Sequence, residues 1–324
     1  MDANERGNFA SLSVAVAAAL LSVFLPRLGA FGVLFLLPLA LAGFFGGERP
    51  MWFAAFLAVT GNAALFFTAW RSAGADSIIL IWNILYYTVM VLAFCWINSG
   101  REKQVPFFSI PPMYRLAIGS LAASAAIVPC FLAVMENREF VRFVGARLDA
   151  LYRASGGEPD TEGFILSLVY FGIRGGILVS ALFFFAISRW LAVFIARLAG
   201  RAAPDAGLVG FKNGRFLIWV LSASLGAVLL GKITDSTLID AGAWNILSLC
   251  AILYLAQGGG IALYFLVRLP PLYRLLVNLA LLVLLFRPGI NAVLLGILIL
   301  AGIIENWVPL RTFGSQGSPP TPGA

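Results

Sequence analysis

The run SIILIWNILYYTVMVLAFCWIN at residues 77–98 decides the fold class of this chain. It holds no charged residue and is long enough to cross a hydrocarbon core as a helix, which takes about 20 apolar residues. The apolar residues do not alternate with the period of two that is typical of an outer-membrane barrel. The sequence therefore predicts an all-α polytopic membrane protein, with the lipid bilayer as its solvent. Similar runs recur along the chain and bring the expected number of transmembrane helices to eight to ten: Phe9–Leu25, Leu28–Phe45, Met51–Trp70, Ser77–Asn98, Leu116–Met135, Phe164–Ile187, Phe216–Gly231, Ala241–Val267, Leu272–Phe286 and Ile290–Ile304.

The composition supports a membrane protein and excludes several classes of enzyme. Of the 324 residues, 61% are hydrophobic and 11% are charged, whereas a soluble protein carries about 25% charged residues. The absence of histidine excludes histidine-dependent acid–base catalysis and histidine ligation of a metal or haem. The chain also lacks the phosphate-binding loop of ATPases, and its three cysteines lie within apolar runs. We therefore expect a protein that is not an enzyme, has no cofactor or metal and has no nucleic-acid partner.

Lysine and arginine predict the orientation, because they are retained on the cytoplasmic side of a bacterial inner membrane. They gather at Arg101–Arg115, Arg189–Arg215 and Arg268–Arg274, and the loops between these clusters are rich in acids. This alternation predicts a cytoplasmic C-terminus. With ten crossings the N-terminus is cytoplasmic too, but Leu28–Phe45 contains Pro38 and would place the N-terminus outside if it re-enters without crossing.

Three parts of the chain are distinguished by composition. Residues 1–313 are predicted to form a single transmembrane domain. Within it, residues 136–163 include an amphipathic stretch that is expected to lie on the outer surface of the membrane, either as a simple interfacial helix or as a lid. Residues 314–324 are rich in proline, glycine and polar residues and are expected to form a disordered cytoplasmic tail.

Two short blocks recur in the same order along the sequence. Trp82-Asn83-Ile84-Leu85 precedes Pro111-Pro112-Met113-Tyr114-Arg115-Leu116, and Trp244-Asn245-Ile246-Leu247 precedes Pro270-Pro271-Leu272-Tyr273-Arg274-Leu275. In the predicted topology both copies share one orientation, as in a parallel internal repeat. The alternative is local convergence, because proline favours the first turn of a helix and tyrosine and arginine favour the interface. Both interpretations stay open at this point.

The candidate substrate-binding residues are polar groups in or beside the apolar runs. Arg174 lies well inside one run, and a guanidinium there can hold a carboxylate or phosphate. The alternative for Arg174 is a structural ion pair or a side chain that reaches toward the interface. Asp76, Asp235 and Asp240 are predicted on the outer side, where they would orient an anionic ligand. Asn83 and Asn245 would bond either to that ligand or between helices.

Small residues suggest two helix-packing surfaces. Ser11, Ala15 and Ala19 form a stripe at four-residue spacing that is suited to docking another helix. Gly258, Gly259 and Gly260 follow Gln257 within a predicted span, where they indicate close helix packing, a kink or a broken helix.

The C-terminal half of the chain resembles the YybS-like family of bacterial multispanning membrane proteins. The resemblance covers roughly residues 160–313 and rests on Phe211-Lys212-Asn213-Gly214-Arg215-Phe216-Leu217-Ile218-Trp219, then Gln257-Gly258, then Asn306-Trp307 through Arg311. The chain departs from the family pattern at Asn213-Gly214, where an aromatic residue is usual, and at Glu305-Asn306, where Asp is usual. The resemblance implies a multispanning membrane protein and no defined activity.

The N-terminal part is similar to two other kinds of membrane protein. Leu37-Pro38-Leu39-Ala40-Leu41-Ala42-Gly43, followed by Gly46-Gly47, resembles the substrate-binding subunits of energy-coupling-factor vitamin transporters. That resemblance implies a ligand pocket and a coupling membrane protein with an ATPase, docked through residues such as Ala15 and Ala19. The cell-shape membrane protein MreD has a related pattern. The leading hypothesis is a transporter-like, ligand-binding membrane subunit, and the alternative is a scaffold of an envelope or division complex.

Overall fold

The computed structural model describes residues 3–73, 77–99, 111–136, 141–142, 145–146, 161–200, 208–285, 287 and 289–312. Every regular element in these ranges is a helix, which confirms the predicted all-α fold. The chain divides into two compact units, Met1–Asp205 and Ala206–Ala324. The sequence predicts a single transmembrane domain and does not predict this division. The amphipathic segment at 136–163 lies mostly outside the described residues, and the tail at 314–324 lies wholly outside them.

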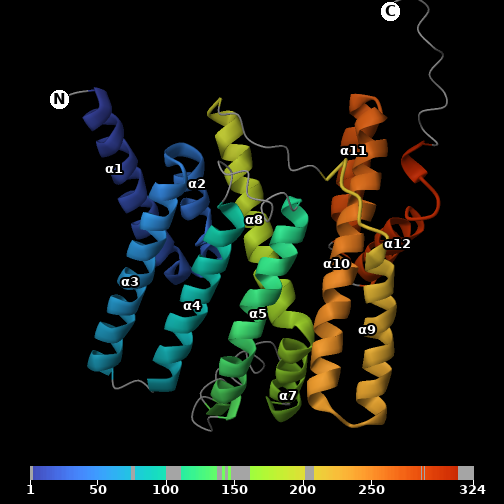
Figure 1. Cartoon of the computed structure of the whole chain (residues 1–324), viewed down its shortest axis with the longest axis horizontal. Coiled ribbons are helices and arrows are strands. Elements are labelled where there is room, and N and C mark those ends of the chain that lie inside the picture. The colour runs from blue at the N-terminus through green and yellow to red at the C-terminus, as the bar shows by residue number, and fades with distance from the viewer. Residues whose placement is uncertain are drawn as a thin grey trace, which may run out of the picture. The chain divides into compact units, whose positions relative to one another are not determined.

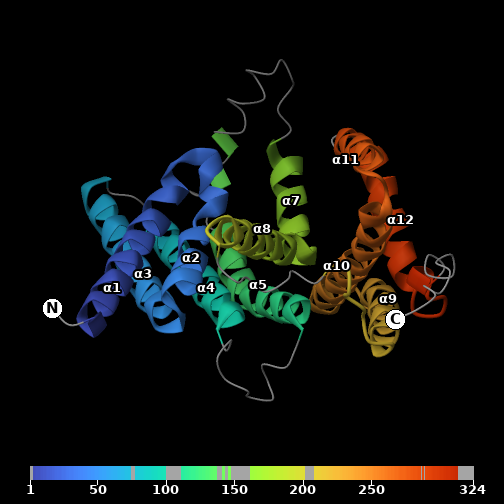
Figure 2. The ribbon, with the colours of Figure 1, turned by 90° about the horizontal axis from the view of Figure 1, so that it is seen from above.

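The first unit is built from long helices that run alternately up and down (Figures 1 and 2). Its elements are α1 (Ala3–Phe24), η1 (Leu25–Arg27), η2 (Gly29–Leu34), α2 (Leu37–Gly46), α3 (Glu48–Ala73), α4 (Ser77–Asn98), α5 (Pro112–Glu136), α7 (Thr161–Phe171), η4 (Gly172–Gly176) and α8 (Ile177–Leu198). Helix α1 packs on α2 and α3, and α8 packs on α2 and α5. Alanines make the α1–α3 contact close, because Ala15, Ala54 and Ala58 are all at most 1% exposed.

The predicted span Leu28–Phe45 is not one continuous helix. It consists of the short 3₁₀ helix η2 followed by the ten-residue helix α2. Pro38 falls in the first turn of α2, where a missing backbone N–H costs nothing. Gly47 ends α2 with a φ of 91°, a conformation that favours glycine, and α3 begins at the next residue.

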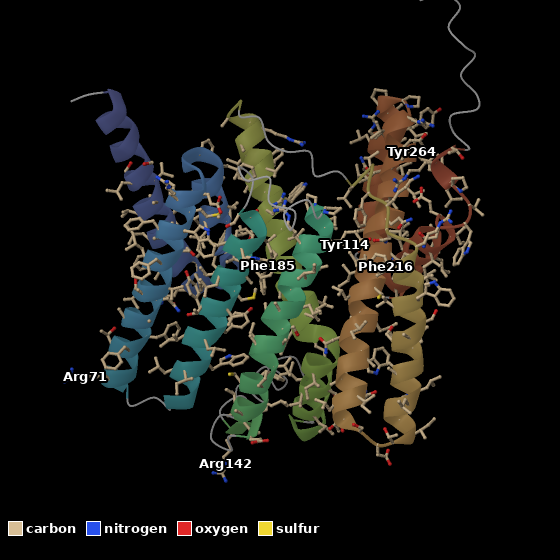
Figure 3. All side chains as sticks on the ribbon, viewed as in Figure 1. Arg71, Tyr114, Arg142, Phe185, Phe216 and Tyr264 are labelled. Carbon is tan, nitrogen blue, oxygen red and sulfur yellow. The ribbon has the colours of Figure 1, made fainter. Side chains whose placement is uncertain are left out.

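The interior of the first unit is aromatic as well as aliphatic. Phe185, labelled in Figure 3, is fully buried, and its ring centroid lies 5.8 Å from that of Phe94 on α4. Ser22 and Tyr87 share a buried hydrogen bond of 2.8 Å between their hydroxyls, which ties α1 to α4. Burying these two hydroxyls is tolerable because each satisfies the other.

The second unit is organised around one long helix. Its elements are α9 (Phe216–Ile233), α10 (Thr237–Arg268), α11 (Pro271–Leu285), α12 (Ile290–Ile304) and η5 (Leu310–Thr312). Helix α10 packs against both α9 and α12 (Figure 2). Ser236 caps the start of α10 by accepting a hydrogen bond from the backbone N–H of Ile239 at 3.5 Å.

The apolar helices make this a multi-pass membrane protein. Among the described residues, six helices are long and apolar enough to cross a membrane: Glu48–Thr68, Leu80–Asn98, Pro112–Glu136, Leu166–Leu198, Phe216–Ile233 and Thr237–Arg268. Four further apolar helical segments are 10–17 residues long. Large side chains such as Leu238 (84% exposed) and Ile233 (80% exposed) cover the outside of the second unit, as suits contact with lipid rather than water.

The two repeated blocks make the same kinds of hydrogen bond: each starts a helix, and its arginine bonds to the end of the preceding helix. Pro111 and Pro270 accept the first backbone hydrogen bonds of α5 and α11 from Arg115 and Arg274. The guanidinium of Arg115 also donates to the carbonyl oxygen of Ser99, at the end of α4, at 3.1 Å. The guanidinium of Arg274 donates to the carbonyl oxygens of Val267 and Leu269, at the end of α10, at 2.5 and 3.2 Å. Each arginine therefore caps the preceding helix, where carbonyl groups lack helical partners.

Helix α10 continues without a break through the three consecutive glycines. A Cβ atom at Gly258 would overlap the carbonyl oxygen of Leu298 on α12, and one at Gly260 would overlap the carbonyl oxygen of Leu208. A Cβ atom at Gly302 on α12 would likewise overlap the carbonyl oxygen of Tyr254. A Cβ atom at Gly259 would meet nothing within 4 Å. Two of the three glycines thus allow close backbone contact, in line with the packing interpretation.

This difference between adjacent glycines predicts opposite effects of the same substitution. Gly258→Ala should destabilise the protein by about 1–3 kcal/mol, because the added methyl group forces α10 and α12 apart. Gly259→Ala should be neutral or stabilising by up to about 1 kcal/mol, because alanine favours the helix. Thermal unfolding of the two purified variants in the same detergent provides the measurement. Equal melting temperatures for the two variants would contradict the close contact at Gly258.

Candidate functional site

The α7–α8 span is interrupted in its first half, and the predicted binding residue Arg174 lies in the interruption. The π-helical turn η4 contains two residues with non-helical backbone angles, Arg174 (φ −83°, ψ 20°) and Gly175 (φ 118°, ψ −5°). The conformation of Gly175 strains any residue with a side chain, so the glycine permits the break. Single π-turns inside helices occur frequently at functional sites. The span from Leu166 to Leu198 is also longer than one perpendicular crossing requires.

Arg174 is exposed and interacts with an aromatic ring of its own helix. Its guanidinium carbon lies 5.1 Å from the ring centroid of Tyr170, within the range of a cation–π interaction. An arginine in an apolar span is costly unless it meets protein or water. The Tyr170 ring meets part of that requirement.

An aromatic pocket of about 250 Å³ opens directly beside the break. Trp82 and Tyr86 come from α4, Phe131 comes from α5, and the glycines of η4 complete the wall. The full lining is Trp82, Tyr86, Ile127, Phe131, Leu168, Phe171, Gly172, Gly176, Ile177, Ser180 and Phe184. We call this set the aromatic pocket.

Glycine and ring packing shape the aromatic pocket. A Cβ atom at Gly172 would lie 2.8 Å from the Phe131 ring, so the missing side chain is what lets that ring approach the break. The Trp82 ring centroid lies 5.9 Å from those of both Tyr86 and Phe131. The lining carries few polar groups, among them the side chains of Tyr86 and Ser180. Such a site suits a small ligand with a flat or apolar body.

The other predicted binding residues are distributed over both units. Asn83 follows Trp82 on α4 and is half-buried. Asp235, Asp240 and Asn245 belong to the second unit, whereas Arg174 belongs to the first. Asp76 lies outside the described residues. Neither compact unit therefore contains the predicted combination of one arginine with three aspartates.

In the second unit, the predicted polar residues have local roles at the start of α10. Asp240 is buried and accepts a hydrogen bond from the indole N–H of Trp244 at 3.1 Å. Asn245 donates from its side-chain amide to the carbonyl oxygen of Ala241 at 2.8 Å. Asp235 is exposed in the turn between α9 and α10, with a φ of 48°. The contacts of Asp240 and Asn245 lie within α10 and require no ligand.

The predicted docking stripe on α1 is largely covered by its own chain. Ala15 and Ala19 are 1% and 4% exposed and belong to the core of the first unit. The close packing of α1 on α3 uses these small residues inside the unit, and docking of a partner protein at this stripe stays a prediction. Ser11 and the Ala15 position still border an open groove of about 960 Å³ beside the start of α3, whose other lining residues include Glu48, Arg49 and Trp52.

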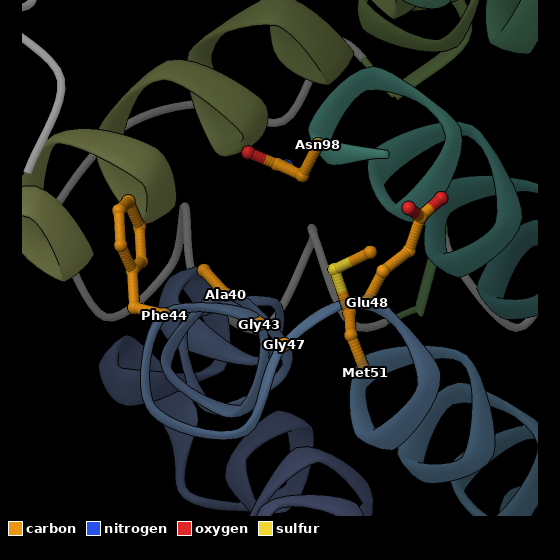
Figure 4. Close-up of a pocket in the computed structure, with 7 residues that line it drawn as sticks. All are labelled: Ala40, Gly43, Phe44, Gly47, Glu48, Met51 and Asn98. Carbon is orange, nitrogen blue, oxygen red and sulfur yellow. The ribbon is translucent and has the colours of Figure 1, made fainter. Parts of the chain in front are cut away.

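A small cavity in the first unit has Glu48 and Asn98 among the residues that line it (Figure 4). The cavity, about 50 Å³, is lined by Glu48 and Met51 of α3, Asn98 of α4 and residues of α2. Arg189 donates to the side-chain oxygen of Asn98 at 2.7 Å, and the Trp52 indole N–H donates to the hydroxyl of Ser99 at 2.8 Å. These bonds join α3, α4 and α8, and the cavity has room for a few water molecules only.

The second unit contains a buried polar network that joins three distant stretches of sequence. Gln257, Glu305 and Arg311 are 1%, 7% and 8% exposed. The side-chain amide of Gln257 donates to Glu305 Oε2 at 3.1 Å, and Arg311 Nε lies 3.2 Å from Glu305 Oε1. The second contact is off the ideal hydrogen-bond direction, so it acts mainly as an ion pair.

The same network secures the irregular backbone before α9. The backbone N–H of Asn213 donates to Gln257 Oε1 at 2.9 Å, and its side-chain amide donates to the carbonyl oxygen of Leu253 at 2.9 Å. A terminal nitrogen of Arg311 donates to the carbonyl oxygens of Phe211 and Gln257 at 2.9 and 3.3 Å. The side chains of Gln257 and Arg311 thus satisfy backbone groups that no helix satisfies, and Glu305 holds those two side chains in place.

Gln257 and Arg311 belong to the motifs that carry the YybS-like resemblance, and Glu305 lies where the chain departs from the family pattern. Their joint role could not be derived from spacing, because Gln257 lies 48 residues from Glu305 and 54 from Arg311 along the chain. The available signal was a polar residue within or directly after an apolar run. The family assignment itself stays a prediction.

Comparison with models of known protein families, with curated proteins and with solved structures finds no match for this chain. The geometry of its own residues is therefore the basis for a functional proposal.

The ion pair in the second unit predicts a strong energetic coupling. Glu305→Leu or Arg311→Leu alone should lower the free energy of unfolding by about 3–5 kcal/mol, because each leaves one buried charge without its partner. The double variant should lose clearly less than the sum of the two losses. Reversible unfolding of the purified protein in detergent gives the three values. The exposed Lys212→Gln variant serves as control and should change stability by no more than about 0.5 kcal/mol. Strict additivity of the two single losses would contradict the coupling.

Proposed function

We propose that this protein is a non-enzymatic membrane subunit that binds a small ligand in the aromatic pocket. The observation that carries the proposal is the break of the α7–α8 span at Arg174 and Gly175, directly beside that pocket. Discontinuous helices form the binding sites of many membrane transporters, since irregular backbone at membrane depth is tolerated where it lines a cavity or is buried in protein. The first unit contains both a discontinuous helix and a pocket beside the break.

The chemistry of the pocket indicates the class of ligand. Five aromatic rings supply an apolar wall for a flat or aliphatic body, and Tyr86 and Ser180 supply hydroxyls that can fix its orientation. Arg174, three residues from Phe171 in the pocket wall, carries a positive charge that suits a carboxylate or phosphate. The proposed ligand is therefore a small molecule with an apolar body and an anionic end.

Energy for transport would come from a separate protein. The sequence lacks the phosphate-binding loop of ATPases, so we propose a coupling membrane protein with an ATPase as partner. The open groove lined by Ser11, Leu12, Glu48 and Arg49 is the proposed docking surface for a helix of that partner. A location in the bacterial inner membrane with a cytoplasmic C-terminus belongs to the same proposal.

A ligand screen with a pocket-filling variant tests the binding site. Purified protein in detergent is heated with vitamins and amphiphilic organic anions, and at least one compound should raise its melting temperature. Ser180→Phe should abolish that increase, because a phenyl ring fills much of the aromatic pocket. Val179→Phe is the matched control, since Val179 is the neighbouring exposed residue on α8 and is not part of the pocket lining. No stabilisation by any compound would contradict the proposal and favour the scaffold alternative.

Arg174 provides a separate test of the ligand charge. Arg174→Gln should weaken binding of an anionic ligand at least tenfold while leaving binding of an uncharged analogue nearly unchanged. The exposed Arg71 at the far end of α3 offers the control Arg71→Gln (Figure 3). Equal affinity of the wild-type protein and Arg174→Gln for the anion would show that Arg174 does not bind the ligand. Isothermal titration of the purified variants distinguishes these outcomes.

A further inference from the structure

A second open groove lies entirely within the second unit, where the chain enters α9. It has a volume of about 600 Å³ and is lined by Arg215, Ile218, Trp219, Ser222, Asn306 and Trp307. Arg215, Trp219 and Ser222 follow the three- and four-residue spacing of one helical face, and Asn306 and Trp307 come from the turn after α12. We call this surface the Arg215 groove.

The position of the Arg215 groove matches the headgroup level of a bilayer. Arg215 directly precedes α9, an apolar span of 18 residues, so its guanidinium lies at the end of a crossing helix. Trp219 and Trp307 are 75% and 65% exposed beside it. Exposed tryptophans at the end of a spanning helix are typical of the membrane–water interface, where the ring is wet on one side and apolar on the other.

Arg215 gives the groove a positive charge, and none of the six described residues that line it is acidic. The nearest acid in sequence, Glu305, is buried and already balanced by Arg311 and Gln257. Lys212, three residues before Arg215, is exposed and adds to the positive potential.

From these features we infer that the Arg215 groove binds the headgroup of an anionic phospholipid. The guanidinium of Arg215 suits the phosphate, and the amide of Asn306 and the hydroxyl of Ser222 suit glycerol or ester oxygens. The acyl chains would follow the outer face of α9, where Leu225 and Leu229 are 49% and 63% exposed. The arginine clusters place this end of α9 on the cytoplasmic side, whose leaflet carries anionic lipids. The site is independent of the aromatic pocket.

Native mass spectrometry of the full-length protein in detergent tests the lipid site. Phosphatidylglycerol and phosphatidylcholine with the same acyl chains are added in equal amounts, and the retained lipid is counted. We expect one phosphatidylglycerol to be retained in clear preference. Arg215→Gln should lower its retention about fivefold, as expected for one arginine at a membrane surface. Arg215→Lys should restore most of the retention, because the charge is kept.

Two controls make the result specific. Arg268→Gln removes another exposed arginine of the second unit, one that lies 4.0 Å above the Tyr264 ring and outside the groove, and should leave retention unchanged. Excess glycerol phosphate should not displace the lipid, because the tryptophans and the α9 surface hold the apolar part. Equal retention of the two lipids would overturn the inference. So would equal losses in Arg215→Gln and Arg268→Gln, or displacement of the lipid by glycerol phosphate.

Discussion

The structure depends on the requirement that every backbone N–H and C=O in the hydrocarbon layer finds a partner within the protein. Helices meet this requirement along their length, and they account for all the regular structure in the described parts of the chain. The remaining problem is the backbone at helix ends and between helices. There the chain places its few polar side chains: Arg115 on the end of α4, Arg274 on the end of α10, and Arg311 with Gln257 on the stretch before α9. With 11% charged residues, the protein uses several of its charges to complete hydrogen bonds.

Two interruptions of regular helix are handled in different ways. Before α9, side chains from α10 and from the segment after α12 close the irregular backbone, and the three main members of that network are less than 9% exposed. At η4, glycine allows the break and the neighbouring space is an open aromatic pocket. A closed network restrains the backbone, since moving it would break the hydrogen bonds from Asn213 to Gln257 and from Arg311 to Phe211. A glycine break beside a cavity can adjust to a ligand at lower cost, which is why the proposed function is placed at η4.

Helix positions were predictable because a membrane span is a local property. The limits of α4 and α12 agree with the apolar runs at Ser77–Asn98 and Ile290–Ile304, and Arg174 was recognised as an unusual residue. Tertiary properties were not predictable in the same way. Glu305 and Arg311 looked like residues at the end of a span, and only the folded chain brings Gln257 into contact with both of them. Similarly, the interruption at η2 depends on how Gly29–Leu34 packs, and Pro38 alone does not reveal it.

The repeated blocks show how a local constraint can produce sequence similarity. Each block starts a helix in contact with the end of the preceding helix, which calls for a first turn without a free N–H and for a donor to the preceding carbonyl groups. Proline meets the first need, and an arginine three or four residues later meets the second. Arg115 and Arg274 make this contact at equivalent places, although α4 has 22 residues and α10 has 32. The shared chemistry is thus sufficient to explain why Pro-Pro-x-Tyr-Arg-Leu occurs twice. A duplicated ancestor would additionally require matching helix lengths or packing around the blocks, and the short α11, of 15 residues, differs from the 25-residue α5 that occupies the same place after the first block.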